Sequence, residues 1–405
     1  MFPDIRGNTV AFTSDDDIWI MDLSQNKPIR LTSGIGVSIR PKISLDGKRV
    51  AFTVIWLKSG KSGGDIYVTG DGESKRVTFF GTNNSRVAGW ISEDEIIVIT
   101  NFHTPFVQWT EAYKVNINDG NFEKLPFGIV SNVAIRDDII VLARGYQDLP
   151  FWKGYKGGTK GELWISYNNG KTFTKFISLD GIVSWPMIVN DRVYFLSDHE
   201  GIANLYSVNL DGKDLRKHTN FTEYYCRNAS SDGNRIVFQN GGDIYLYDPK
   251  SEQLIKLEID LPTDRKKRQP KFVNVTEYMT EAVVNGNYIS LVSRGKIFLM
   301  RPWEGPAVQL GSKQGVRYRQ IQLLPNGDVI AVDDSDKLVI LGKDGSEKKI
   351  DKDFGRIERV KVSPDGKKVL ISNNKLELWL YEIESNSAKL IDNCLLYTSP
   401  SPRDS

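Results

Sequence analysis

The sequence predicts an all-β protein, with a six-bladed β-propeller followed by about three blades of a second, incomplete β-propeller. Three observations support this fold class. A short strand motif recurs along the chain, an Asp-Gly or Asn-Gly hairpin precedes several of its copies, and no stretch has sustained helical periodicity. Repetition of this kind is typical of radially repeated folds, in which each repeat is one supersecondary unit.

The strand motif consists of an acidic or polar residue, an aliphatic residue and an aromatic residue. Clear copies lie at 17–19, 65–67, 162–164, 204–206, 243–245 and 377–379, and looser ones at 112–113, 296–298 and 337–339. From one anchor residue to the next, the step is 39 to 53 residues. This interval matches one four-stranded propeller blade.

The hairpin motif supplies the strand before the strand motif. Its copies are SLDGKRVAFT (44–53), SSDGNRIVFQ (230–239), LPNGDVIAVD (324–333) and SPDGKKVLIS (363–372). Asp-Gly and Asn-Gly permit the positive φ angles of a tight turn, and the alternating residues that follow predict a half-buried strand.

The repeats divide the chain into a six-bladed propeller (1–259), a linker (260–271) and a partial second propeller (272–393). The linker contains the basic run 265–268, for which a nucleic-acid patch is the alternative to a solvated linker. The last residues, 394–405, follow neither motif, and we expect them to be a tail foreign to the gene.

Composition favours a cytoplasmic protein that binds neither nucleic acid nor a membrane. Lys and Arg number 53 against 51 Asp and Glu, which leaves a net charge of +2. No apolar run approaches the length of a membrane span, and the chain does not begin with a signal-peptide pattern. The two cysteines, Cys226 and Cys394, exclude a disulfide framework.

Candidate catalytic residues are few, and we predict no catalytic residue, no metal and no cofactor. Residues 60–64 match a nucleophile elbow around Ser62, but they lie between two predicted strands rather than at a strand-to-helix turn. The histidines, His103, His199 and His218, fall in three different repeats, and the last two are expected on surface turns. Cys226 has no metal-ligand partner spaced around it.

The stretch FWKGYKGGTKGELW (151–164) predicts an unusually long loop within the fourth repeat. It separates the strands predicted at 139–144 and 162–166, where a two-residue turn would suffice. Phe151, Trp152 and Tyr155 offer apolar area to pack the loop down. Its lysines are then either solvated cations or attractants for peptide carboxylates; they are Lys153, Lys156 and Lys160.

Longer stretches of the chain resemble a known family. PDIRGNTVAFTSDDDIW (3–19), FWKGYKGGTKGELWI (151–165) and the segment 191–249 are similar to the first propeller of tricorn proteases. LVSRGKIFL (291–299) is similar to the start of the second propeller of that family. The hairpin repeats alone are shared with TolB-like proteins and with the propellers of prolyl-oligopeptidase relatives.

The resemblance implies the N-terminal, substrate-channelling part of a cytoplasmic serine peptidase that degrades oligopeptides downstream of the proteasome. It implies a homo-oligomer, a hexamer in the full-length family, and a catalytic region beyond residue 405, so we expect this chain to be a truncated fragment and inactive alone. The alternative is a non-enzymatic TolB-like propeller for protein–protein interaction. The family anchors the substrate carboxylate with an Arg pair, for which the matching segment 76–90 offers Arg86. The expected substrate-binding residues are Arg86, Lys153, Tyr155, Lys156 and Lys160.

Overall fold

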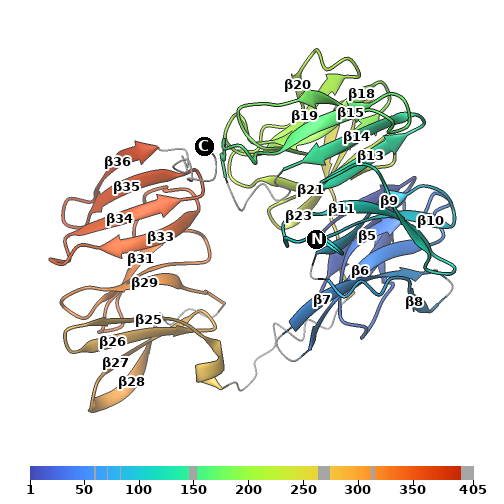
Figure 1. Ribbon diagram of the computed structural model, residues 1–405. Coiled ribbons are helices and arrows are strands. Elements are labelled where there is room, and N and C mark those ends of the chain that lie inside the picture. Colours follow the sequence, from blue (N-terminus) through green and yellow to red (C-terminus); the bar gives the residue numbers. More distant parts are fainter. Residues whose placement is uncertain are drawn as a thin grey trace. The chain divides into compact units, whose positions relative to one another are not determined.

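The computed structural model describes residues 1–58, 61–70, 72–82, 84–145, 153–262, 274–311 and 315–393. Apart from one 3₁₀ helix, η2 (Val275–Tyr278), the described elements are strands, and they form nine four-stranded antiparallel sheets. The chain divides near residue 264 into two compact units (Figure 1). The predicted all-β class and the blade-like repeat are confirmed. The predicted linker and tail limits stay predictions, because residues 263–273 and 394–405 lie outside the described part of the chain.

The first unit contains six sheets, and the four strands of each sheet follow one another in the sequence. The first three sheets comprise β1 (Asp4–Arg6), β2 (Thr9–Ser14), β3 (Asp17–Asp22), β4 (Lys27–Arg30); β5 (Val37–Ile43), β6 (Val50–Lys58), β7 (Lys61–Thr69), β8 (Ser74–Arg76); and β9 (Ser85–Trp90), β10 (Glu95–Thr100), β11 (Glu111–Asn116), β12 (Phe122–Lys124). The next three comprise β13 (Asn132–Arg136), β14 (Ile139–Arg144), β15 (Glu162–Ser166), β16 (Thr174–Ile177); β17 (Val183–Val189), β18 (Arg192–Ser197), β19 (Asn204–Asn209), β20 (Arg216–Lys217); and β21 (Cys226–Ser231), β22 (Ile236–Asn240), β23 (Asp243–Asp248), β24 (Gln253–Lys256).

The six sheets form a closed ring around their first strands. β1 contacts β5, β5 contacts β9, and the series continues through β13, β17 and β21 back to β1. No sheet borrows a strand from another, so the ring closes by packing between the sixth sheet and the first rather than by a shared strand. Each blade is therefore held by its two neighbours.

Apolar side chains fill every interface between successive sheets. Phe52 and Ile18, for example, lie in the cluster between the first two sheets, and Phe238 and Leu196 lie in the cluster between the fifth and sixth. At the closure, Phe12 and Trp19 of the first sheet pack with Ile244 and neighbouring residues of the sixth. The aliphatic and aromatic positions of the strand motif supply many of these residues, because alternate side chains of a strand face opposite neighbours.

The acidic position of the strand motif has a structural task within its own sheet. The Asp17 carboxylate accepts a hydrogen bond from Thr32 Oγ1 at 2.9 Å, and Thr32 Oγ1 accepts the backbone N–H of Ile18 at 3.0 Å. The side chain thus ties the start of the third strand to the end of the fourth. The same arrangement recurs in the pairs Asp65–Thr78 and Asn204–Thr219.

The described part of the second unit contains three such sheets. Their strands are β25 (Met279–Asn285), β26 (Tyr288–Ser293), β27 (Lys296–Arg301), β28 (Glu304–Leu310); β29 (Arg319–Leu323), β30 (Val329–Val332), β31 (Leu338–Leu341), β32 (Glu347–Lys349); and β33 (Ile357–Val362), β34 (Lys368–Asn373), β35 (Glu377–Glu382), β36 (Ser387–Asn393). β25 contacts β29, and β29 contacts β33.

The hairpin glycines of both units adopt the positive φ angles that the sequence predicted, at Gly47, Gly233, Gly327 and Gly366.

Candidate functional site

A cavity lies at the centre of the six-sheet ring. Its volume is about 350 Å³, and it is lined by residues from all six first strands. Its charged lining includes Arg6, Lys42 and Arg136, opposed by Asp4 and Asp232. The passage therefore has polar, mixed-charge walls rather than the apolar walls of a typical small-molecule pocket.

A smaller cavity of about 30 Å³ lies at the level where several first strands begin. The residues that line it include Phe2, Arg40, Arg86, Asn132, Trp185 and Asn228. Five of these residues lie in the first strands of the second to sixth sheets, and Phe2 lies just before β1. We call this set the constriction.

β-bulges help to shape the constriction. β5, β17 and β21 each pair with the next strand of their sheet. In these three pairs the register shifts at Arg40, Trp185 and Asn228, respectively. These three residues have positive φ angles of 57°, 55° and 52°. A bulge adds a residue to one strand and redirects a side chain. The repetition of the same irregularity in three sheets indicates a shared role at the centre of the ring.

Arg86 is the most deeply buried cation of the constriction, with 3% of the residue exposed. Its guanidinium donates to Asn84 Oδ1 at 2.9 Å and to the backbone carbonyl of Ser131. Among the described residues, Arg86 Nε has no hydrogen-bond partner. Burial lowers the pKa of this guanidinium well below its ordinary value, and the nearby charge of Arg40 lowers it further. Arg86 was predicted from the sequence as a binding residue, whereas Arg40 was not. Arg40 could have been found as a charged residue in the strand that precedes the Asp-Gly hairpin at 46–47.

Asp4 ties the ring together beside the larger cavity. It is 5% exposed, and its carboxylate accepts the backbone N–H of Ile43 at 2.8 Å and Lys42 Nζ at 3.0 Å. It also accepts the hydroxyl of Ser230. One carboxylate thus joins the first, second and sixth sheets.

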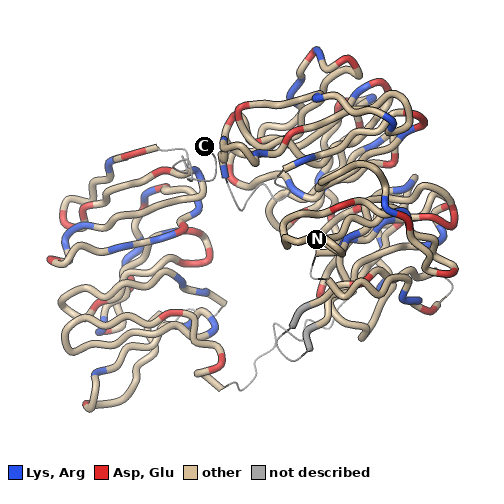
Figure 2. The backbone as a smooth tube through the Cα atoms, in the orientation of Figure 1, with Lys and Arg blue, Asp and Glu red and all other residues tan. Residues whose placement is uncertain are grey.

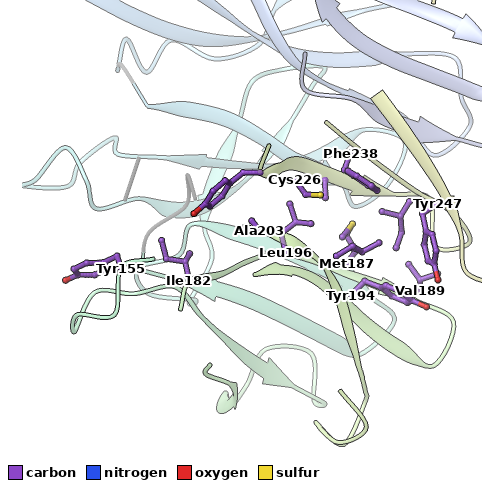
Figure 3. Close-up of a cluster of buried hydrophobic side chains, with 14 residues drawn as sticks. Tyr155, Ile182, Met187, Val189, Tyr194, Leu196, Ala203, Cys226, Phe238 and Tyr247 are labelled. Atoms are coloured by element: carbon purple, nitrogen blue, oxygen red, sulfur yellow. The ribbon is translucent and has the colours of Figure 1, made fainter. Parts of the chain in front are cut away.

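The long loop lies where predicted, between β14 and β15, and it packs down through Tyr155. This side chain is 7% exposed and belongs to the apolar cluster that contains Ile182 (Figure 3). The backbone N–H of Gly154 donates to Asp198 at 2.9 Å. Burial raises the pKa of Asp198 to about 6, although hydrogen bonds from backbone N–H groups, those of Gly154 and Ile182 among them, oppose the shift. At the base of the loop, Gly145 has a φ of 85°, and a Cβ there would lie 2.5 Å from a backbone oxygen.

Two lysines of the loop have partners within the protein. Lys156 forms an ion pair with Asp180, and Lys160 Nζ donates to the backbone carbonyl of Leu179 at 2.7 Å. Lys153 is half-buried. The residues that line the two cavities include none of these lysines, whereas Arg86 is among them. Phe151 and Trp152 lie outside the described residues.

The structure brings no catalytic set together in the described residues. Ser62 lies within β7 and pairs with Leu57 of β6, so the residue is in a strand, not at a strand-to-helix turn. This corrects the predicted strand start: the backbone pairing of the hairpin extends β7 back to Lys61. No group of three or more His, Cys, Asp or Glu that could hold a metal occurs in the described part of the chain.

Two serine–histidine pairs were not predicted from the sequence, and both are structural. Ser197 Oγ lies 3.0 Å from His199 Nδ1, Ser197 is fully buried, and only 13% of the His199 side chain is exposed, so His199 is not the surface residue that we predicted either. Ser207 Oγ lies 2.7 Å from His218 Nε2, and Tyr247 OH lies 2.9 Å from His218 Nδ1. Ser207 is 0% exposed and also accepts Arg192 Nε, so a substrate cannot reach it. Burial lowers the pKa of His218 to about 4. The histidine is thus a neutral link between the fifth and sixth sheets rather than the surface residue that we predicted.

Charges on the surface are mixed in sign over both units. Figure 2 shows Lys and Arg interspersed with Asp and Glu along the described chain. None of the helices in the described part is long and apolar enough to cross a bilayer. The basic run 265–268 lies outside the described residues.

Comparisons with known proteins agree with the two units. Residues 1–253 match the family model for the tricorn protease N-terminal β-propeller domain, and residues 277–395 match the model for the tricorn protease second β-propeller domain. A tricorn protease homologue from Saccharolobus solfataricus is 77% identical over 392 residues, which cover 97% of this chain and 37% of that protein. A putative tricorn-like protease N-terminal subunit from Sulfurisphaera tokodaii is 70% identical over 172 residues, which cover 42% of this chain and 88% of that protein.

A solved structure agrees with these matches. The crystal structure of the tricorn protease superimposes with a TM-score of 0.63 at 31% identity, and the match covers 97% of this chain and 39% of that one. The chain thus spans less than two fifths of the length of the S. solfataricus protein and of that crystallised chain.

Proposed function

This chain belongs to the tricorn protease family, and we propose that its six-sheet ring is a passage for oligopeptides in a serine peptidase that degrades them. The chain carries the propeller part of such a peptidase, because both propeller models match in order along it. The peptidase activity, the oligopeptide substrates, a hexameric assembly and a cytoplasmic location are parts of this proposal. The catalytic groups are expected elsewhere in the complete protein.

The observation that carries the proposal is the lining of the ring. All six first strands contribute to the larger cavity, and the cations Arg6, Lys42 and Arg136 outnumber the acids Asp4 and Asp232 on its wall. Arg40 and Arg86 add two more cations at the constriction. Charges on low-dielectric walls focus their field into a cleft, so an excess of cations on these mixed-charge walls favours peptides with a free carboxylate.

We assign the loop and Arg86 to substrate binding within this proposal. Tyr155 packs the loop down, and its lysines are Lys153, Lys156 and Lys160. The β14–β15 loop is at the end of the strands where β17 and β21 begin, and the constriction lies near the same end. The ion pair of Lys156 with the exposed Asp180 contributes little to stability, so a peptide carboxylate can compete with Asp180 for this cation.

The test is to replace the three lysines with Gln and to measure the binding of short fluorescent peptides. Binding of peptides with a free C-terminus should weaken about 3–10-fold at low salt, less at high salt, because screening shortens the reach of these charges. Amidated peptides should bind as before. A matched control replaces Lys27, Lys48 and Lys250, which are exposed and lie in hairpins at the other ends of the strands.

The outcomes separate the two functional classes. If free-acid and amidated peptides lose affinity equally, or if neither does, the loop does not recognise carboxylates. If no peptide binds to the parent chain either, the ring is not a peptide passage, and an interaction module becomes the better proposal.

A further inference from the structure

We infer that the constriction of the six-sheet ring binds one small monovalent anion, of the size of chloride or formate, between Arg40 and Arg86. This site shares Arg86 with the proposed peptide passage, but it requires no peptide and no part of the protein outside this chain. The inference is carried by the burial of Arg86, its open donor and the adjoining cavity.

The geometry leaves one donor of Arg86 for a ligand. Only 3% of Arg86 is exposed, and its Nε makes no hydrogen bond to the described residues. The partners of its other nitrogens, Asn84 Oδ1 and the Ser131 carbonyl, are neutral. A buried polar donor without a partner costs about 1–3 kcal/mol, and more when it is charged.

The charge of Arg86 also needs compensation. A guanidinium keeps its proton in proteins, so the site cannot become neutral by losing it. The effective cost of burying an ion is several kcal/mol unless an opposite charge lies nearby. The charged neighbour that acts most on Arg86 is Arg40, another cation, whose guanidinium lies 5.1 Å from the centre of the Phe2 ring. An anion between the two arginines would accept the unmade hydrogen bond of Arg86 and offset its buried positive charge.

The cavity sets the size and the charge of the ligand. Its volume of about 30 Å³ exceeds the roughly 10–15 Å³ of probe-occupied space that holds one water. The cavity therefore has room for one small ion such as a halide or formate. The remaining lining includes apolar residues, among them Pro3, Pro41 and Val87, which suits a weakly hydrated monovalent ion better than a divalent one.

The experiment measures the melting temperature of the whole chain at equal ionic strength with chloride, formate or gluconate as the only anion. At a hundred times the dissociation constant, chloride or formate should raise the melting temperature of the first unit by about 5–10 °C over gluconate. Arg86→Gln should abolish this difference. Arg192→Gln is the control, because Arg192 already pairs with Asp214 and lies outside the constriction, and it should keep the anion effect.

Two further measurements cover a variant that fails to fold. Arg40→Gln should reduce the anion effect without removing the Arg86 side chain. Crystals of the parent chain in bromide should give an anomalous peak within hydrogen-bond distance of Arg86 Nε.

Each remaining outcome contradicts the inference. Equal melting temperatures in all anions, an effect that survives in Arg86→Gln, or a bromide peak elsewhere in the ring would each overturn it. Stabilisation by a free-acid tripeptide but by neither chloride nor formate would overturn the small-anion site and support the peptide passage instead.

Discussion

The closure of the ring by Asp4 gives the sharpest stability prediction. Asp4→Ala removes the acceptor for three groups at once: the Ile43 N–H, Lys42 Nζ and the Ser230 hydroxyl. The carboxylate is 5% exposed, and 18% of the Lys42 side chain is exposed, so little water can replace it. Breaking a buried ion pair by removing one partner costs about 3–5 kcal/mol. Asp4→Asn keeps one acceptor oxygen, and we expect it to cost about 1–3 kcal/mol.

Hydrogen exchange followed by mass spectrometry is the suitable assay, because it reports on the two units separately. Since neighbours hold each blade, Asp4→Ala should lower the free energy of opening in all six sheets of the first unit and leave the second unit unchanged. Asp46→Asn is the control, an exposed acid in the β5–β6 hairpin whose change should stay within about 0.5 kcal/mol. A decrease in the free energy of opening that is confined to β1, or that is no larger than in Asp46→Asn, would refute the idea that Asp4 closes the ring.

Three further predictions follow from the same structure. The pKa of His218 is about 4 in the fold against an ordinary 6.5, so the unfolded state binds more protons between these two pH values. The free energy of unfolding should therefore fall as the pH drops from 6.5 to 4, by up to about 3 kcal/mol. Urea titrations of His218→Gln should show a smaller fall over the same pH range. The chain alone should not cleave fluorogenic peptides. Turnover that disappears in Ser62→Ala would contradict the prediction that Ser62 is not a catalytic residue. Limited proteolysis should cut within 260–271 and leave a resistant N-terminal piece, whereas equal resistance along the chain would count against the predicted linker.

The sequence alone determined the repeat and hence the fold class. The aromatic anchors recur at blade length, and Asp-Gly or Asn-Gly turns mark the first hairpins of several sheets, because both signals depend on local backbone geometry and on the alternation of side chains in a strand. The limits of the long loop were also predictable, since β14 is a continuous apolar run (IIVLAR) and β15 carries the strand motif (ELW). The acidic position of the strand motif was visible as a pattern, but its hydrogen bond to a threonine about fifteen residues later was not.

Only the tertiary structure decided which side chains meet at the centre of the ring. Arg40 and Arg86 lie in different sheets and 46 positions apart, and they come together because the first strands of the six sheets of the first unit converge on one axis. The bulges beside Arg40, Trp185 and Asn228 depend on pairing with the next strand, so no local sequence rule predicts which way these side chains turn. Likewise, Asp4 and Ser230 are 226 residues apart, and they form a hydrogen bond only because the ring closes.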